Sequence, residues 1–282
     1  MHAASMIYLL TGLAYLAAGA CLAIGFYKAQ VGLRRLGILL AVIGLAGHVY
    51  AIWTKMATPL GWDVNFVNDL ALASLIIIVV LLLTSLRSRM LEAGIIALPG
   101  AALCVWLLWL ANPEPLILGH VSAQLELHVF SSLLAYGLLS IAAINAILLA
   151  IQDRLLRHPR RLQQLELLPP LTVLESLLFR LVLAGWLVLT LSLMTGLTFV
   201  DDLLAQHLVH KTVLSIISWL LFGSLLVGRW WFGWRGRRAV NWTLAAMLVL
   251  VLAYFGSKLV LEVILDRSWT SPATSTQLIS HG

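Results

Sequence analysis

The chain has 282 residues, of which 61% are hydrophobic and only 11% are charged, and its formal net charge is +6. Soluble domains are about half apolar and about a quarter charged. This composition excludes a soluble enzyme, a disordered chain and a nucleic-acid-binding protein. The two cysteines, Cys21 and Cys104, do not form a Cys-x-x-Cys pair, which excludes a disulfide scaffold and a thiol-redox site.

Long apolar runs indicate helices that cross a membrane. A bilayer core of about 30 Å requires about 20 apolar residues in a helix, whereas strands of a membrane barrel are shorter and alternate in polarity. The runs in this chain are long and do not alternate. The sequence predicts an all-α, polytopic membrane helix bundle with about eight transmembrane helices, at residues 6–26, 36–53, 66–86, 91–110, 125–151, 179–200, 213–227 and 239–261.

Lysine and arginine are distributed unevenly between the two sets of predicted connections. All but four of the 18 fall on one side, and the other side carries only Lys55, Lys211, Lys258 and Arg267. Cytoplasmic loops are enriched in these residues, so we expect the richer side to be cytoplasmic and both termini to be outside. The positive charge is therefore a signal of topology, and the basic, Trp-rich segment 231–238 is interpreted as an interfacial anchor rather than a nucleic-acid site.

We expect a single domain, a membrane bundle over residues 1–265, followed by a flexible outer tail over 268–282. The main cytoplasmic loop is predicted at 152–178. Within it, Thr172 and Glu175 have the spacing of a capping box. This spacing predicts a short interfacial helix before the sixth span.

Histidines are concentrated toward one side of the predicted bundle, and only His158 falls on the cytoplasmic side. Ionisable groups within a span are costly and are candidates for function. His48 is the deepest of them, and it lies on a seam of small residues formed by Gly37, Ala41, Gly44 and Ala51. Such a seam allows a close helix crossing, and it also leaves room beside the imidazole for a flat ligand. Two interpretations therefore stay open: a ligand histidine, or an imidazole hydrogen-bonded to a neighbouring helix.

Further histidines lie at the outer starts of two other predicted spans. His128 begins the fifth span, and His207, His210 and Lys211 begin the seventh. Each of these alone is typical of a solvated interfacial residue, but together with His48 they place imidazoles from separate helices at a similar depth.

Two neutral imidazoles that face each other are a usual way to hold haem iron. The candidate cofactor-binding residues are His48, His128, His210, His207 and Lys211, with His48 and His128 as the metal ligands. Zinc, with Asp201 and Asp202 nearby, is the alternative metal, although structural zinc sites normally use four ligands.

Motifs of familiar catalytic sites are absent from the sequence. It contains no GxSxG, no Walker loop, no HExxH and no GxGxxG that opens a helix. Asp69 is the one carboxylate near a span that could serve an ion-coupled pump. We therefore do not expect an enzyme.

Four blocks of the C-terminal half occur in an order that carries a resemblance. They are 127–137, which includes His128 and Tyr136, then 211–219, 233–238, and Ala253-Tyr254-Phe255-Gly256. Over about residues 125–265 the chain resembles the cytochrome c assembly family of haem-handling membrane proteins, which includes CcsA, CcmC and CcmF. The likeness is greatest to small bacterial members of the YpjD and HemX type.

The resemblance implies a haem-handling protein of the bacterial inner membrane, with His128 as one of the histidines that flank haem. In such a membrane, the termini expected outside from the charge distribution would be periplasmic. The family's Trp-rich outer segment should precede Lys211, but residues 201–210 contain no tryptophan, and no histidine occurs in 258–267. The resemblance therefore implies haem binding without implying haem delivery to a cytochrome.

Three hypotheses follow for function. The first is a b-type haem held near the outer face by His48 and His128, with His210 or His207 as a substitute ligand and Lys211 or Lys55 on the propionates. Its partners would be haem, the lipid bilayer and other haem-handling or cytochrome assembly membrane proteins, and no nucleic acid. The second is a non-enzymatic membrane scaffold or regulatory protein without haem. The third is a small-solute transporter, for which Pro99-Gly100 is the one interruption of a span.

Overall fold

The computed structural model describes residues 2–87, 91–111, 113, 115, 117–118, 123–156, 170–199 and 206–256. Its helices are α1 (His2–Tyr27), α2 (Val31–Met56), α3 (Phe66–Arg87), α4 (Gly94–Leu110), α5 (Ala123–Leu156), α6 (Leu171–Phe199), α7 (Gln206–Phe232) and α8 (Arg237–Val251). A short 3₁₀ helix, η1 (Leu91–Ala93), precedes α4, and a π-helical turn, η3 (Leu252–Gly256), follows α8. Eight helices in this part of the chain are long and apolar enough to cross a membrane, which confirms the predicted membrane bundle.

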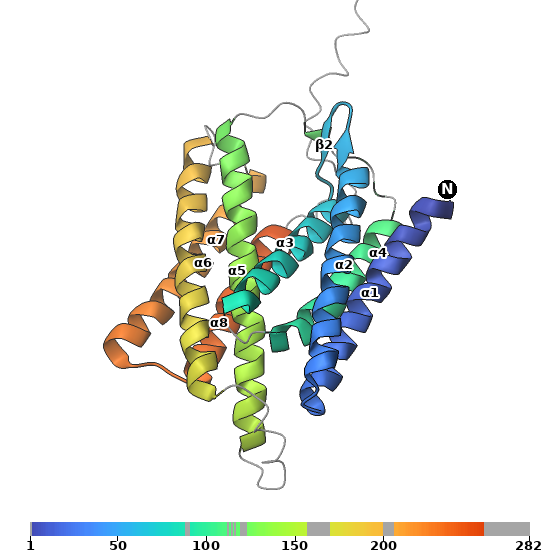
Figure 1. The fold of residues 1–282 in the computed structure, drawn as a ribbon. Coiled ribbons are helices and arrows are strands. Elements are labelled where there is room, and N and C mark those ends of the chain that lie inside the picture. Colours follow the sequence, from blue (N-terminus) through green and yellow to red (C-terminus); the bar gives the residue numbers. More distant parts are fainter. Residues whose placement is uncertain are drawn as a thin grey trace, which may run out of the picture.

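The helices form two packed groups with α3 between them (Figure 1). Helices α1, α2 and α4 pack together on one side, and α5, α6, α7 and α8 pack together on the other. Helix α3 contacts α2 and α4 in the first group and α5 in the second. Helix α3 is therefore the element at which residues from both groups can meet.

Three short strands form a small antiparallel sheet at one end of the bundle, named here the sheet end. They are β1 (Ala57–Thr58), β2 (Gly61–Asp63) and β3 (Ile117–Leu118), in the order β1-β2-β3. Strands β1 and β2 connect the end of α2 to the start of α3 and lie above α2 in Figure 1. None of these strands was predicted, because the segments are too short to show an alternating pattern.

The seam of small residues on α2 packs directly against α1. A Cβ atom on Gly44 would lie 2.7 Å from Cδ1 of Tyr15, and one on Gly37 would lie 3.0 Å from Cδ2 of Leu22. Small residues allow backbones to approach closely where hydrophobic burial gives no driving force between helices. The predicted close helix crossing is therefore present, with α1 as the partner.

Paired indoles join α6 to α7. The rings of Trp186 and Trp219 are stacked with centroids 5.3 Å apart and an interplanar angle of 19°. Trp186 Nε1 donates to the carbonyl of Trp219, and Trp219 Nε1 donates to Thr190 Oγ1 at 2.8 Å. Both indole N–H groups are thus satisfied inside the bundle, as buried tryptophans require.

Helix α6 begins before the predicted sixth span, which was expected from residue 179. Helix α6 begins at Leu171, where the Pro170 carbonyl accepts from the amide of Val173, and continues without a break into the span. No separate interfacial helix precedes it among the described residues, and most of the predicted loop, at 157–169, lies outside them.

The predicted capping box is also wrong, because Glu175 serves another element. Its Oε1 accepts the backbone N–H of Gly236 at 3.1 Å and lies 3.7 Å from Arg229. Gly236 and Gly233 have φ values of 55° and 62°, a conformation that glycine adopts without strain, and they form the tight turn between α7 and α8. Glu175 therefore fixes this turn to the side of α6.

The α1–α2 crossing gives a stability prediction. We expect Gly44→Ala to lower the free energy of unfolding by about 1–3 kcal/mol, because the new methyl group overlaps the buried ring of Tyr15. The measurement is the thermal unfolding midpoint of the purified protein in detergent. Gly100→Ala is the matched control, since a Cβ there meets nothing within 4 Å, and it should leave the midpoint unchanged or raise it. Equal midpoints for the two variants would contradict the packing described.

Candidate functional site

A cavity of about 410 Å³ lies where α3, α5, α6, α7 and η3 meet, toward the sheet end. Sites for small molecules usually have volumes of about 300–1,000 Å³ and mostly apolar walls with a few polar groups. Apolar side chains, with leucine the most frequent, form most of these walls. The polar groups that carry the chemistry of the cavity are Asp69, His128, Ser192, Lys211 and Tyr254.

The orientation of His128 is fixed by the backbone of α6. Its Nδ1 lies 2.9 Å from the carbonyl oxygen of Ser192. A carbonyl can only accept, so Nδ1 carries the proton and Nε2 of the neutral ring is left with a lone pair. Nε2 has no hydrogen-bond partner among the residues that the structure describes. Histidines that bind metals are commonly held in this way, by a carbonyl or carboxylate on the other nitrogen.

Gly196 and Ser192, two small residues on α6, allow the imidazole of His128 to lie against this helix. A Cβ on Gly196 would lie 2.8 Å from Cε1 of His128, so only glycine leaves room for the imidazole against the helix. Ser132 Oγ is 2.7 Å from both the His128 carbonyl and Ser192 Oγ, which ties α5 to α6 at the same level. The imidazole is therefore held by α6 as well as by its own helix.

Two further polar groups of the cavity, Asp69 and Lys211, both contact the side chain of Tyr254. Its hydroxyl donates to Asp69 Oδ2, and Lys211 Nζ lies 5.6 Å from the centroid of its ring. Tyr136 packs beside it with ring centroids 5.9 Å apart and donates its own hydroxyl to the Leu250 carbonyl. Tyr254 belongs to the π-helical turn η3, and such turns are frequent at functional sites.

His48 is not part of this cavity. It is fully buried (0% exposed), and its Nδ1 lies 3.2 Å from the hydroxyl of Tyr15 on α1, with the two rings in an edge-to-face arrangement. Its Nε2 has no hydrogen-bond partner in the described part of the chain, although the backbone of Ala71 on α3 is close by. The hydrogen-bonded interpretation of His48 is the one that the geometry supports.

The expected pairing of His48 with His128 is therefore corrected. The structure does not bring them to one cavity, since only His128 is among the lining residues. The flat group that fills the space beside His48 is the ring of Tyr15, which lies against Gly44.

Lys211 lines the cavity as expected, but the side chains of His207 and His210 lie outside the described residues. The side of α7 that faces the cavity is marked by Lys211, Thr212 and Ser215, which line it. The two histidine positions differ in their angle from this side. His207 is four residues before Lys211 and shares that side of the helix, whereas His210 is offset from Lys211 by about 100°. Helix periodicity thus favours His207.

The zinc alternative gains no support from the geometry. Asp201 and Asp202 lie outside the described residues. Within the described ones, no group of three or more histidine, cysteine or acidic side chains could hold a metal ion. Nor do Pro99 and Gly100 break α4, which is a continuous helix, so the interruption expected of a transporter helix is not seen there.

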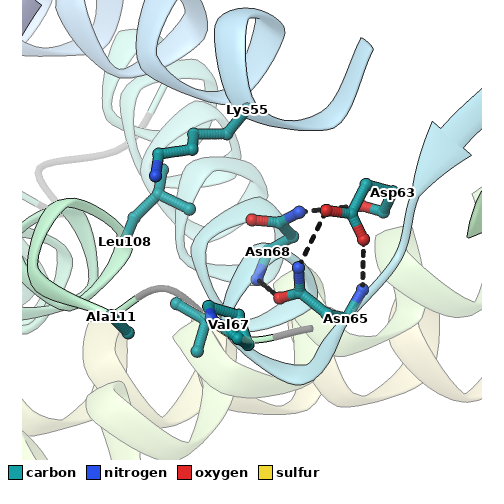
Figure 2. A pocket seen from close by; sticks show the side chains of 8 residues that line it. Lys55, Asp63, Asn65, Val67, Asn68, Leu108 and Ala111 are labelled. Atoms are coloured by element: carbon teal, nitrogen blue, oxygen red, sulfur yellow. Dashed lines mark hydrogen bonds between the residues drawn. The ribbon is translucent and has the colours of Figure 1, made fainter. Parts of the chain in front are cut away.

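A second, smaller cavity of about 100 Å³ lies at the sheet end between α2, α3 and α4 (Figure 2). Asn65 Oδ1 accepts the amide of Asn68 at 3.0 Å and so caps the first turn of α3. Asn65 Nδ2 donates to Asp63 Oδ2, and Asn68 Nδ2 donates to the Asp63 carbonyl. Lys55 lines the same space rather than the larger cavity. The volume suits a few water molecules, each of about 30 Å³, so this cavity is too small for a porphyrin.

Sequence reasoning missed several residues of the larger cavity. Ser192 acts through its backbone carbonyl, which no sequence motif reveals, and Gly196 is one of 20 glycines in the chain. Tyr254 did carry a signal, since it belongs to one of the four blocks on which the resemblance rests. Asp69 was noted only as a possible pump residue.

Fold and site together define an eight-span membrane protein with an apolar cavity that presents one oriented imidazole and one ammonium group. The family described as "Cytochrome C assembly protein" matches residues 36–265, and the chain belongs to this family. The match runs from within α2, at Leu36, past η3 and thus includes every residue that lines the larger cavity. The expected family likeness is confirmed.

Known relatives agree with this assignment. "Inner membrane protein YpjD" of Escherichia coli strain K12 is 34% identical over 263 residues, which cover 91% of this chain and 98% of the relative. "Cytochrome c biogenesis protein CcsA" of Prochlorococcus marinus strain MIT 9303 is 31% identical over 88 residues, which cover 30% of this chain and 28% of that protein. No solved structure matches the chain.

Proposed function

We propose that this protein binds b-type haem in the larger cavity and takes part in haem handling related to cytochrome c biogenesis. The observation that carries the proposal is the orientation of His128, whose Nδ1 is committed to the Ser192 carbonyl and whose Nε2 keeps a lone pair at the cavity wall. Membership of the cytochrome c assembly family supports the involvement of haem. The protein acts by binding and has no turnover of its own.

The residues of the cavity fit this ligand by type. His128 would hold the iron from α5, and His207 is the better-placed candidate for a second ligand, with His210 as the alternative. Leucine and valine side chains suit an apolar macrocycle, and the Lys211 ammonium suits a propionate, because charge-assisted hydrogen bonds are the stronger ones. When bound, haem would supply an iron centre whose properties depend on these axial ligands.

Location and partners are proposed on the same grounds. The relative from Escherichia coli is named as an inner membrane protein, and the asymmetry of lysine and arginine supports periplasmic termini. The CcsA relatives are named for cytochrome c biogenesis, which supports other haem-handling or cytochrome assembly membrane proteins as partners. The larger cavity would then open toward the periplasmic side of the inner membrane.

Haem binding is tested by titrating the purified full-length protein with haem in detergent and recording the Soret band. We expect His128→Ala to weaken binding by at least 10–100-fold, roughly the range for disturbed metal ligation, and to shift the band. His48→Ala is the matched control: it should lower the thermal unfolding midpoint by loss of the Tyr15 contact but keep the band. His207→Ala should alter the band more than His210→Ala.

Two results would overturn this function. One is a wild-type protein that leaves the Soret band of haem in detergent unchanged, which would favour the scaffold hypothesis. The other is a band that His128→Ala leaves unchanged, which would place the haem elsewhere.

Orientation is tested by labelling single cysteines in intact spheroplasts with a membrane-impermeant maleimide. Cys21 and Cys104 are first replaced by serine, and one cysteine is then introduced as Leu60→Cys beside β2 or as Gln30→Cys between α1 and α2. Both positions are exposed. We expect Leu60→Cys to be labelled and Gln30→Cys to require permeabilisation, because the basic connections stay in the cytoplasm. The reverse pattern would invert the topology.

A further inference from the structure

Asp69 places a carboxylate inside the larger cavity. It lies in the first turn of α3, is 6% exposed, and lines the cavity together with Lys211 and Tyr254. Burial of a carboxylate is costly unless a positive charge or hydrogen-bond donors compensate for it. An acid at this position is therefore unexpected in a site whose proposed ligand is itself negatively charged.

The same aromatic side chain contacts the acid and the base of the cavity. Tyr254 donates its hydroxyl to Asp69 Oδ2, and the Lys211 ammonium lies 5.6 Å from the centroid of its ring. Charges interact more strongly in surroundings of low dielectric than in water, and the walls of this cavity are mostly apolar. Asp69 and Lys211 therefore line one mostly apolar cavity with opposite charges, which attract each other before any ligand enters.

A ligand carboxylate that approaches Lys211 must then share the ammonium with Asp69. The ligand gains one favourable charge interaction and incurs repulsion from the acid already present. The net effect is weaker binding than the lysine alone would give, and faster release.

We propose that Asp69 is a specificity-determining residue that competes with the ligand's carboxylate for Lys211 and so keeps an amphipathic, carboxylate-bearing ligand exchangeable. This inference rests on the proposed function, because it concerns a porphyrin in the same cavity. It adds that the cavity is built to release its ligand as well as to bind it, which suits a protein that passes a ligand on.

The test uses mesoporphyrin IX, which lacks iron and so does not depend on ligation by His128, and its dimethyl ester, which lacks the free carboxylates. Affinity is measured by fluorescence, and dissociation by transfer to apomyoglobin. We expect Asp69→Asn to bind the dicarboxylate on the order of tenfold more tightly and to release it more slowly. The dimethyl ester should bind wild type and Asp69→Asn equally.

Further variants distinguish an effect of the Asp69 charge on ligand affinity from an effect of the substitution on folding. Asparagine has the same shape as aspartate and can still accept the Tyr254 hydroxyl, so the thermal unfolding midpoint should change little. Glu126→Gln removes the same charge from an exposed position on α5 that does not line the cavity, and it should have no effect on affinity. In a Lys211→Gln background, the gain from Asp69→Asn should become smaller, because the competition for the ammonium is gone and only the direct repulsion between Asp69 and the ligand's carboxylate is relieved.

The outcomes show separately whether the role of Asp69 fails or whether the proposed haem binding fails. If wild type binds the porphyrin and Asp69→Asn binds it no more tightly, the competition is refuted while haem binding stands. An equal gain for the dimethyl ester would also refute it, because the effect would not depend on the ligand's charge. If wild type binds neither haem nor porphyrin, the proposed function fails as well.

Discussion

The hydrogen bond between His128 Nδ1 and the Ser192 carbonyl is the contact on which the site depends. It joins α5 to α6, selects the tautomer of the imidazole and directs the remaining lone pair away from the backbone. In a membrane bundle, a free backbone carbonyl is unusual, because each one is normally satisfied within its own helix. Carbonyls have two lone pairs, however, and the absence of a side chain at Gly196 lets the ring reach one of them.

Most of the fold could be predicted because the bilayer imposes a length and a composition on every span. Windows of about 20 apolar residues found all eight helices. The prediction failed at the cap of α6, because the helix starts at Leu171 with the Pro170 carbonyl accepting the amide of Val173, and not with Thr172 as the cap. Glu175 has the spacing of a cap, but a partner 61 residues away in sequence takes it instead.

The site was predictable only in part, because sequence gives the depth of a residue in the membrane more readily than its direction. His48 and His128 were correctly placed on separate helices, but helix packing turns His48 toward Tyr15 and out of reach of the cavity. Nothing in the seam of α2 distinguishes a neighbouring tyrosine ring from a ligand, because both are flat. His128 and Lys211 could be predicted as residues of the cavity because each is ionisable and lies in a block that carries the family resemblance. The contribution of Ser192 comes from its backbone carbonyl, which leaves no pattern in the sequence.

Helix α3 connects the two packed groups and gives the α1–α2–α4 group a role in a site that it does not line. Asn65 caps α3 on the side of the smaller cavity, where Asp63 and Asn68 complete the hydrogen bonds (Figure 2). That cap fixes how the first turn of α3 is rotated about the helix axis. Asp69 directly follows Asn68 in this turn, and its side chain lines the larger cavity. The polar cluster at the sheet end therefore fixes the position of Asp69, whose carboxylate accepts the Tyr254 hydroxyl. A change in how α2 and α4 pack against the start of α3 would move Asp69 and so alter the charge interactions in the larger cavity, although neither helix contacts the ligand.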